Sequence, residues 1–157
     1  MRIQPRVVLW PTDFSEHALE AGRYARAVAE QFGAALHVVH VVELPITPDG
    51  TGMIPIEYPL GSYSPEFVES AKAGLARLLA EHFAGTPNLH SDVLLGNPWQ
   101  GVCHYAEQKQ ADLLVITTHG RTGLQHLLIG STAERIVQHS PCPVLVVKPG
   151  RRSMLVT

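Results

Sequence analysis

The sequence has few of the features that mark secreted or membrane-embedded proteins. Only 2 of its 157 residues are cysteines, Cys103 and Cys142, too few for a disulfide scaffold and without metal-ligand spacing. The longest apolar runs, such as residues 113–116 and 144–147, fall far short of the roughly 20 residues that a membrane-spanning helix needs. No long hydrophobic stretch or small-residue cleavage site follows Met1. We therefore expect no signal peptide and a cytoplasmic location.

An excess of charge of one sign is also lacking. The 12 Lys and Arg residues oppose 14 Asp and Glu residues, which gives a formal net charge of -2. Nucleic acids and anionic lipids are attracted mainly by a strong positive field. We therefore expect no nucleic-acid partner and no membrane partner. The length fits one compact domain, and we assign residues 1–157 to a single domain.

Hydrophobic patterning predicts five strands that alternate with four helices. Short, continuous apolar runs indicate strands covered on both faces, at residues 7–10, 36–42, 90–95, 113–116 and 143–147. Apolar residues at three- and four-residue steps predict helices between Ser15 and Gly33, from Ser64 to near Gly85, after the turn at residues 96–98, and at residues 131–140. The predicted buried stripes include Phe32 in the first helix and Val137 in the fourth.

This alternation predicts an α/β fold with an open, five-stranded parallel sheet and helices on both faces, a Rossmann-like arrangement. The segment of residues 43–65 breaks the pattern, because its prolines and glycines forbid a long regular element. We interpret it as a long loop that is a lid, a partner surface, a mobile insert or a variable surface loop.

Two segments that follow strands carry residues suited to a ligand site. Pro11, Thr12 and Asp13 follow the first strand, and residues 117–123 follow the fourth and lead to the helix that opens at residues 130–132. In open parallel sheets, ligands bind at the carboxyl ends of strands where the strand order reverses. With the order 3-2-1-4-5, these two segments flank that point.

The opening of the fourth predicted helix suits a phosphate group, because the first turn of a helix offers unpaired N–H groups and the positive end of its dipole. Gly130 allows close approach of the backbone, and Ser131 and Thr132 add hydroxyl donors. The preceding loop can bend at its glycines and supply a cation. The glycines of this loop are Gly120 and Gly123, and the cation is that of Arg121. The alternative is that the glycines only shape a loop and Ser131 only caps the helix.

Asp13 is the predicted acceptor on the opposite wall. A carboxylate repels phosphate but accepts hydrogen bonds from ribose hydroxyls, so the pair of segments suits a nucleotide. The alternative is that Asp13 helps Ser15 to cap the first helix.

Five segments together resemble the universal stress protein family. They are residues 10–16 (WPTDFSE), 38–42 (VVHVV), 119–123 (HGRTG), 130–135 (GSTAER) and 141–147 (PCPVLVV). The resemblance implies the strand order 3-2-1-4-5 and homodimers formed through the last strand, here Val144, Leu145, Val146 and Val147. That strand is apolar and terminal, and an unprotected sheet edge invites pairing with a second copy.

The resemblance also implies ATP binding, which one branch of the family marks by glycine, two residues, glycine, nine residues, then glycine and serine or threonine. Gly120, Gly130 and Ser131 match this pattern, whereas Thr117 occupies the first glycine position. A β-branched residue there could crowd the ligand or donate its hydroxyl to it. By the same resemblance Thr12, Asp13 and Val41 border adenine and ribose. The residues that hold phosphates are then Gly120, Gly130, Ser131 and Thr132.

We therefore predict an adenine-nucleotide-binding stress-response or regulatory module that takes ATP, with or without Mg²⁺, and has no permanent cofactor. A P-loop lysine and an identifiable water-positioning residue are lacking, so we expect no dedicated catalysis. The 9 histidines do not repeat at metal-ligand spacing, and we expect no metal site; His119 shapes the loop, contacts phosphate or transfers a proton. A nucleotide-free interaction module and a slow ATPase stay as alternatives.

Overall fold

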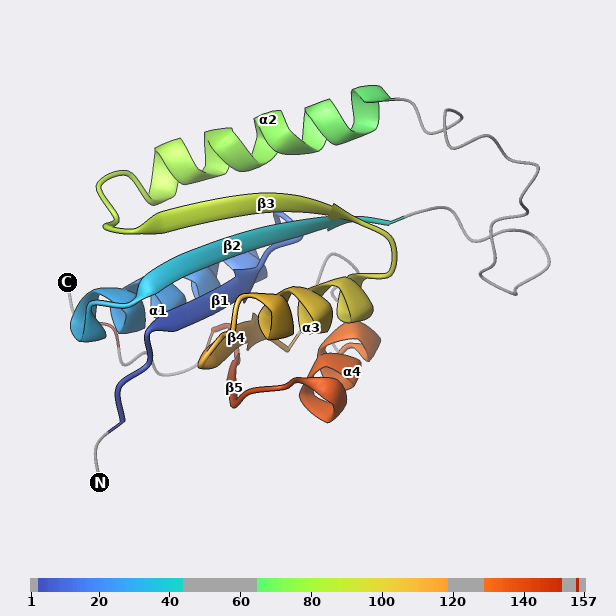
Figure 1. Ribbon diagram of the computed structural model, residues 1–157. Helices are drawn as coiled ribbons and strands as arrows, with labels where there is room; N and C mark the ends of the chain where they lie inside the picture. The colour runs from blue at the N-terminus through green and yellow to red at the C-terminus, as the bar shows by residue number, and fades with distance from the viewer. Residues whose placement is uncertain (1–2, 44–64, 119–128, 151–154, 156–157) are drawn as a thin grey trace.

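The computed structural model describes residues 3–43, 65–118, 129–150 and 155. Within these residues, strands and helices alternate as predicted (Figure 1). The elements are β1 (Val7–Pro11), α1 (Glu16–Phe32), β2 (Ala35–Val42), α2 (Pro65–His82), β3 (Leu89–Leu95), α3 (Pro98–Gln108), β4 (Leu113–Thr117), α4 (Ser131–His139) and β5 (Val144–Val147). The predicted Ser64 cap and most of the predicted loop at residues 43–65 lie outside the described residues.

The strands form one parallel sheet in the order β3-β2-β1-β4-β5, which confirms the predicted fold class. Helices α1 and α2 cover one face of the sheet, and α3 and α4 cover the other (Figure 1). From β1 the chain first adds β2 and β3 on one side, and it then crosses to add β4 and β5 on the other side. The switch point of the sheet therefore lies between β1 and β4.

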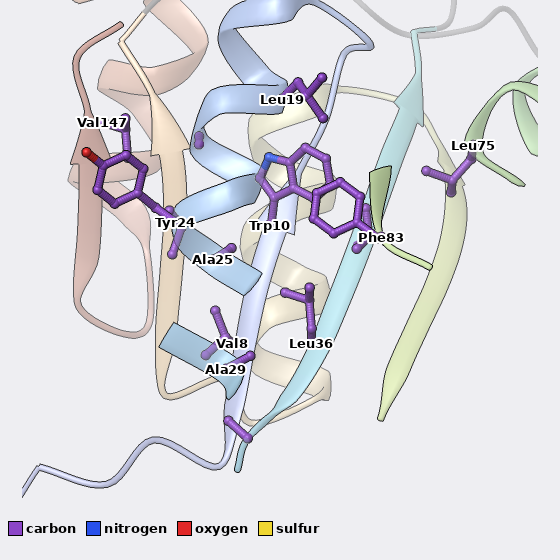
Figure 2. Packing of buried hydrophobic residues seen from close by; sticks show 14 residues of the cluster. Val8, Trp10, Leu19, Tyr24, Ala25, Ala29, Leu36, Leu75, Phe83 and Val147 are labelled. Atoms are coloured by element: carbon purple, nitrogen blue, oxygen red, sulfur yellow. The ribbon is translucent and has the colours of Figure 1, made fainter. Parts of the chain in front are cut away.

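Trp10 in β1 is the largest side chain of the core on the α1 side. It is fully buried, and its indole Nε1 donates a hydrogen bond to the carbonyl oxygen of Ala18 at 3.0 Å. Its ring stacks on Phe83, with 4.9 Å between the ring centroids (Figure 2). Gly22 of α1 faces the indole, and a Cβ atom built there would stand 2.5 Å from the Trp10 ring. The helix lies close to the sheet because this position has no side chain.

The helix ends follow the sequence closely. The Ser15 hydroxyl accepts from the Ala18 amide at the start of α1, and Gly33 ends the helix in the left-handed region with φ 66°. Asn97 caps α3, and Pro98 is its first residue.

Two predicted core positions are wrong. Phe32 is 42% exposed, because it is the last residue of α1 and the core ends beside it at Ala29 and Ala34. Val137 is 45% exposed, whereas its neighbour Ile136 is buried. Consecutive helical residues point about 100° apart, so a helix at the margin of the sheet buries one of the two and leaves the other in solvent.

Candidate functional site

The predicted ligand segments meet at the carboxyl ends of the two central strands. β1 and β4 are neighbours, with Val8 opposite Leu113 and Leu9 opposite Leu114. Both strands run in the same direction, and Thr12 and Asp13 follow the end of β1 while Thr118 follows the end of β4. The carbonyl oxygen of Thr118 accepts a hydrogen bond from the Gly130 amide at 2.7 Å, so the start of α4 is tied to the same edge.

Thr12 holds the first segment in place. It is 5% exposed, and all three of its polar groups are used. Its amide donates to the Val39 carbonyl at 2.8 Å, and its hydroxyl accepts from the Phe14 amide at 3.1 Å. The Thr12 carbonyl lies 2.8 Å from Nδ1 of His40. Because a carbonyl oxygen only accepts, Nδ1 carries the proton in this bond. The segment is therefore fixed without a ligand.

Asp13 is half-buried and points one carboxylate oxygen at the cap of α1. Its Oδ1 accepts from the Ser15 amide at 3.0 Å and from the Ser15 hydroxyl at 2.6 Å. The capping alternative is thus confirmed for Oδ1. These bonds also fix the carboxylate, since Ser15 is itself held by accepting from the Ala18 amide at 3.2 Å. A fixed acceptor at a sheet edge is suited to hydrogen-bond donors such as ribose hydroxyls.

The start of α4 is arranged differently from the starts of α1 and α3. Its N-cap is Gly130, which has no side chain to accept from the amides of the first turn. The alternative that Ser131 caps the helix is wrong, because Ser131 is the first helical residue. Ser131 and Thr132 are exposed. The acidic residue of this turn, Glu134, accepts from the Gln138 side chain at 3.3 Å along the helix. Amides and hydroxyl groups are thus presented together at this end.

Thr117 lies on the opposite face of the sheet from α4. Side chains alternate along a strand, and Ile116 packs on the α3 and α4 side while Val115 packs on the α1 side. Thr117 therefore faces the α1 side, like its register partner Val147. Its hydroxyl oxygen is buried and has no hydrogen-bond partner within the described part of the chain. The side chain at the first motif position thus does not stand between β4 and the start of α4.

Val41 lies near the carboxyl end of β2, next to β1 in the sheet. It is half-buried and packs on the α3 side of the sheet. A Cβ atom built on Gly101 of α3 would lie 3.6 Å from a Val41 methyl group, an ordinary contact, so α3 closely covers this residue. Pro11 is half-buried at the end of β1, opposite Val39.

The structure therefore brings most of the predicted site residues it describes to one edge of the sheet. Those at or just after the ends of the two central strands, or at the start of α4, are Pro11, Thr12, Asp13, Thr117, Gly130, Ser131 and Thr132. Val41 is one strand away from β1. Four predicted residues lie outside the described part of the chain; they are His119, Gly120, Arg121 and Gly123.

Comparison with known proteins decides the family. The sequence model of the universal stress protein family matches residues 5–148. The chain belongs to the universal stress protein family. It is 35% identical over 147 residues to universal stress protein MJ0531 of Methanocaldococcus jannaschii, covering 92% of this chain and 83% of that one. It is 34% identical over 148 residues to a universal stress protein of Thermus aquaticus, covering 91% of this chain and 98% of that one.

Solved structures show the same fold. Protein MJ0577, from the same archaeon, superimposes with a TM-score of 0.79 at 25% identity, over 96% of this chain and 100% of that one. A universal stress protein solved in complex with cAMP superimposes with a TM-score of 0.69 at 21% identity, over 92% of this chain and 98% of that one. The predicted family and its strand order are thus confirmed.

Three residues of this universal stress protein that hold the site together escaped the sequence analysis. They are Phe14, His40 and Thr118. Phe14 has a φ of 67°, a conformation that costs a residue with a Cβ atom about 1–3 kcal/mol. No local pattern marks such a residue, because the left-handed conformation is common only for glycine, asparagine and aspartate. His40 and Thr118 are buried polar residues within apolar surroundings, and that contrast was a usable signal.

A separate polar cluster joins β2, β3 and α3. The Tyr105 hydroxyl donates to Oδ2 of Asp92 at 2.6 Å, and it lies 3.0 Å from Nδ1 of His37. His37 also stacks on His90, with ring centroids 4.6 Å apart. Burial lowers the pKa of His37 from 6.5; His90 and Lys109 lower it further, against the opposing effect of Asp92. Burial and the bond to Asp92 raise the pKa of Tyr105. The cluster contains none of the predicted site residues.

This cluster makes the stability depend on pH. Because the folded protein lowers the pKa of His37 below its value of 6.5, the unfolded chain takes up a proton first as the pH falls. The stabilisation is present above pH 6.5 and is lost as the pH falls toward the folded-state pKa. We expect urea unfolding to show a larger loss of stability between about pH 7.5 and about pH 5.5 for the wild type than for His37→Gln. An exposed histidine variant, His17→Gln, serves as the control and should behave as the wild type. Equal losses for all three proteins would contradict this.

The described residues also form an open groove of about 330 Å³ between α3 and the end of α4. It is lined by Trp99, Gln100, Cys103, His104, Glu107, His139 and Pro141, none of which belongs to the predicted site. Trp99 packs there against His139, with 4.8 Å between the ring centroids. Trp99 is therefore a packing residue at the start of α3.

Within residues 3–43, 65–118 and 129–150, no group of three or more His, Cys, Asp or Glu residues could hold a metal ion. No helix of the same part of the chain is long and apolar enough to cross a membrane.

Proposed function

We propose that this universal stress protein binds an adenine nucleotide, ATP in the first place, and acts as a nucleotide-dependent stress-response or regulatory module. The observation that carries the proposal is the junction at Thr118. Its carbonyl holds the Gly130 amide at 2.7 Å, and the strand that it follows, β4, is the neighbour of β1, which leads into Asp13. An anion-binding helix start and a fixed carboxylate thus share one sheet edge at the switch point.

The two walls suit the two ends of a nucleotide. In the proposed complex the phosphates lie at the amides of the first turn of α4, with the Ser131 and Thr132 hydroxyl groups as additional donors. The ribose lies beside Asp13, and the base lies toward Val41 on β2. Residues 119–123 carry the further predicted contacts, from His119, Gly120, Arg121 and Gly123.

The position of Thr117 supports an open site. Because its side chain faces the α1 side, it does not stand between β4 and the start of α4, where the proposed phosphate site lies. The family glycine at this position is therefore not required for approach from the α4 side. The replacement of the motif glycine by Thr117 favours a nucleotide-free interaction module only if the threonine side chain blocks the site. Its position on the α1 side weakens that alternative.

The proposal includes binding and no dedicated catalysis. Adenine nucleotides are bound by hydrogen bonds from backbone amides and hydroxyl groups, and the chain has no P-loop lysine. Mg²⁺, if it enters with ATP, is held through the phosphates. Slow hydrolysis stays an alternative, and it is measured in the same samples as phosphate release.

The test is nucleotide extraction followed by titration. Acid extracts of the purified protein are analysed for carried nucleotide, and the nucleotide-free protein is titrated calorimetrically with ATP, with and without Mg²⁺. Adenosine and tripolyphosphate are titrated in parallel to separate the base and ribose from the phosphates, and cAMP is included because a protein of this fold was solved with it. We expect ATP to bind more tightly than either fragment. No carried nucleotide and no heat of binding at millimolar ATP would refute the proposal.

We also propose a homodimer through β5. This strand is the sheet edge after β4, and Val144, Leu145 and Val146 are only half-buried. The Pro143 carbonyl accepts from the Leu114 amide and the Val147 carbonyl from the Thr118 amide, so these residues face β4. Backbone groups alternate in direction along a strand, and the N–H and C=O groups of Val144 and Val146 therefore face away from the sheet. Paired edges of two copies would satisfy those groups.

Light scattering tests the dimer. We expect twice the mass of one chain for the wild type, and the mass of a single chain for Val146→Pro, which removes an outward N–H donor. Circular dichroism of the variant controls for folding. A wild-type mass of one chain at every concentration would exclude the dimer.

A further inference from the structure

One histidine lies where an apolar side chain would be expected. His40 is 8% exposed in β2, between Val38 and Val39 on one side and Val41 and Val42 on the other. A buried polar ring is unfavourable in such a strand unless its N–H groups are hydrogen-bonded. Here Nδ1 donates to the Thr12 carbonyl at 2.8 Å, across 28 residues of sequence. The value of a histidine at this position therefore lies in that donor.

The bond fixes more than one residue. The Thr12 hydroxyl accepts from the Phe14 amide at 3.1 Å, and the Phe14 ring lies against the His40 ring, with 4.2 Å between the centroids. Phe14 has a φ of 67°, so its backbone keeps this conformation only because its surroundings hold it. The Phe14 ring is also closely covered by α2, since a Cβ atom built on Gly74 of that helix would lie 3.6 Å from the ring.

We infer that His40 is a positioning residue for the candidate nucleotide site, an inference that rests on the proposed function. It holds the Thr12 carbonyl and the Phe14 ring, and Asp13 lies between these two residues. The residue that follows it in β2 is Val41, the predicted neighbour of the base. One side chain thus links the ribose side of the site to the base side. A site held in this way loses little freedom when the ligand binds.

The test compares a variant without the donor with one that keeps it. His40→Leu places a methyl group where Nδ1 stands, whereas His40→Asn places an amide N–H₂ donor near the same point. We expect His40→Leu to weaken ATP binding by about tenfold and His40→Asn to stay within about threefold of the wild type. His37→Leu is the matched control, because His37 lies on the opposite face of the same strand. It should leave the affinity unchanged.

Two measurements need no ligand. Amide hydrogen exchange of Phe14 and Ser15 should be faster in His40→Leu than in the wild type, and unchanged in His40→Asn and His37→Leu, because both amides bond within the held segment. In the wild type, ¹⁵N NMR of the imidazole should find the proton on Nδ1. This second measurement tests the hydrogen-bond donor even if His40→Leu does not fold, because an imidazole without a proton on Nδ1 cannot hold the Thr12 carbonyl.

The outcomes are separable. A wild type that binds no ATP refutes the proposed function, while the exchange rates and the Nδ1 proton still test the positioning role. A wild type that binds ATP, together with a folded His40→Leu of unchanged affinity and exchange, overturns the inference. So does an imidazole without a proton on Nδ1. A folded His40→Asn that restores neither the affinity nor the exchange rates would also count against the inference, because the hydrogen-bond donor would then not account for the positioning.

Discussion

Gly130→Val is expected to weaken ATP binding by about a hundredfold without unfolding the protein. Gly130 is the N-cap of α4, and the proposed phosphate site is the first turn that follows it. Branched methyl groups at this position would keep a phosphate away from the amides. One hydrogen bond to a charged group contributes about 1.5–3 kcal/mol, which is about 10- to 150-fold in affinity, so the loss of one strong bond or two weaker ones gives about a hundredfold.

The fold itself should tolerate the change. The backbone of Gly130 has φ -70° and ψ 153°, an extended conformation that valine adopts readily. A Cβ atom there would lie 3.4 Å from the Thr118 carbonyl oxygen, which is an ordinary contact. The hydrogen bond between the Gly130 amide and that oxygen can therefore persist.

Calorimetric titration with ATP measures the effect, and thermal unfolding without nucleotide provides the control. Gly130→Ala should fall between the wild type and Gly130→Val, because it adds the Cβ atom without the branches. If the wild type, Gly130→Ala and Gly130→Val have equal affinities and equal unfolding temperatures, the phosphates do not bind at the start of α4. A fall in unfolding temperature that parallels the loss of affinity would attribute the effect to folding.

The sequence was sufficient for the architecture because each element depends on neighbours in the chain. Continuous apolar runs located all five strands, and Ser15 caps α1 as predicted. The errors lie at positions whose burial depends on contacts with segments that are distant in the sequence. Phe32 and Val137 fit an apolar stripe, but their exposure depends on where the sheet ends.

The site was predicted less completely for the same reason. Sequence spacing named Asp13 and Gly130, yet it could not show that the Gly130 amide is bonded to the Thr118 carbonyl, nor on which face of β4 the Thr117 side chain lies. The role of His40 depends on a bond across 28 residues. The sequence shows a histidine among valines, and only the folded chain shows the carbonyl to which it donates.

The second large effect is expected at Gly22. Gly22→Ala should destabilise the protein by about 1–3 kcal/mol, although alanine is the better helix former, because its Cβ atom would stand 2.5 Å from the Trp10 ring. The indole has little room to move, since it is fully buried, donates to the Ala18 carbonyl and stacks on Phe83.

Gly74→Ala is the matched control for this change. Gly74 is also inside a helix, but a Cβ atom there would lie 3.6 Å from the Phe14 ring, an ordinary contact. The gain in helix propensity should then dominate and stabilise the protein by up to about 1 kcal/mol. Urea unfolding of both variants measures the two free energies. Opposite signs are expected, because both changes bring the same gain in helix propensity and only the one at Gly22 forces two rigid groups together. A stabilised Gly22→Ala would mean that α1 can move away from β1, and that the indole does not fix the distance between them.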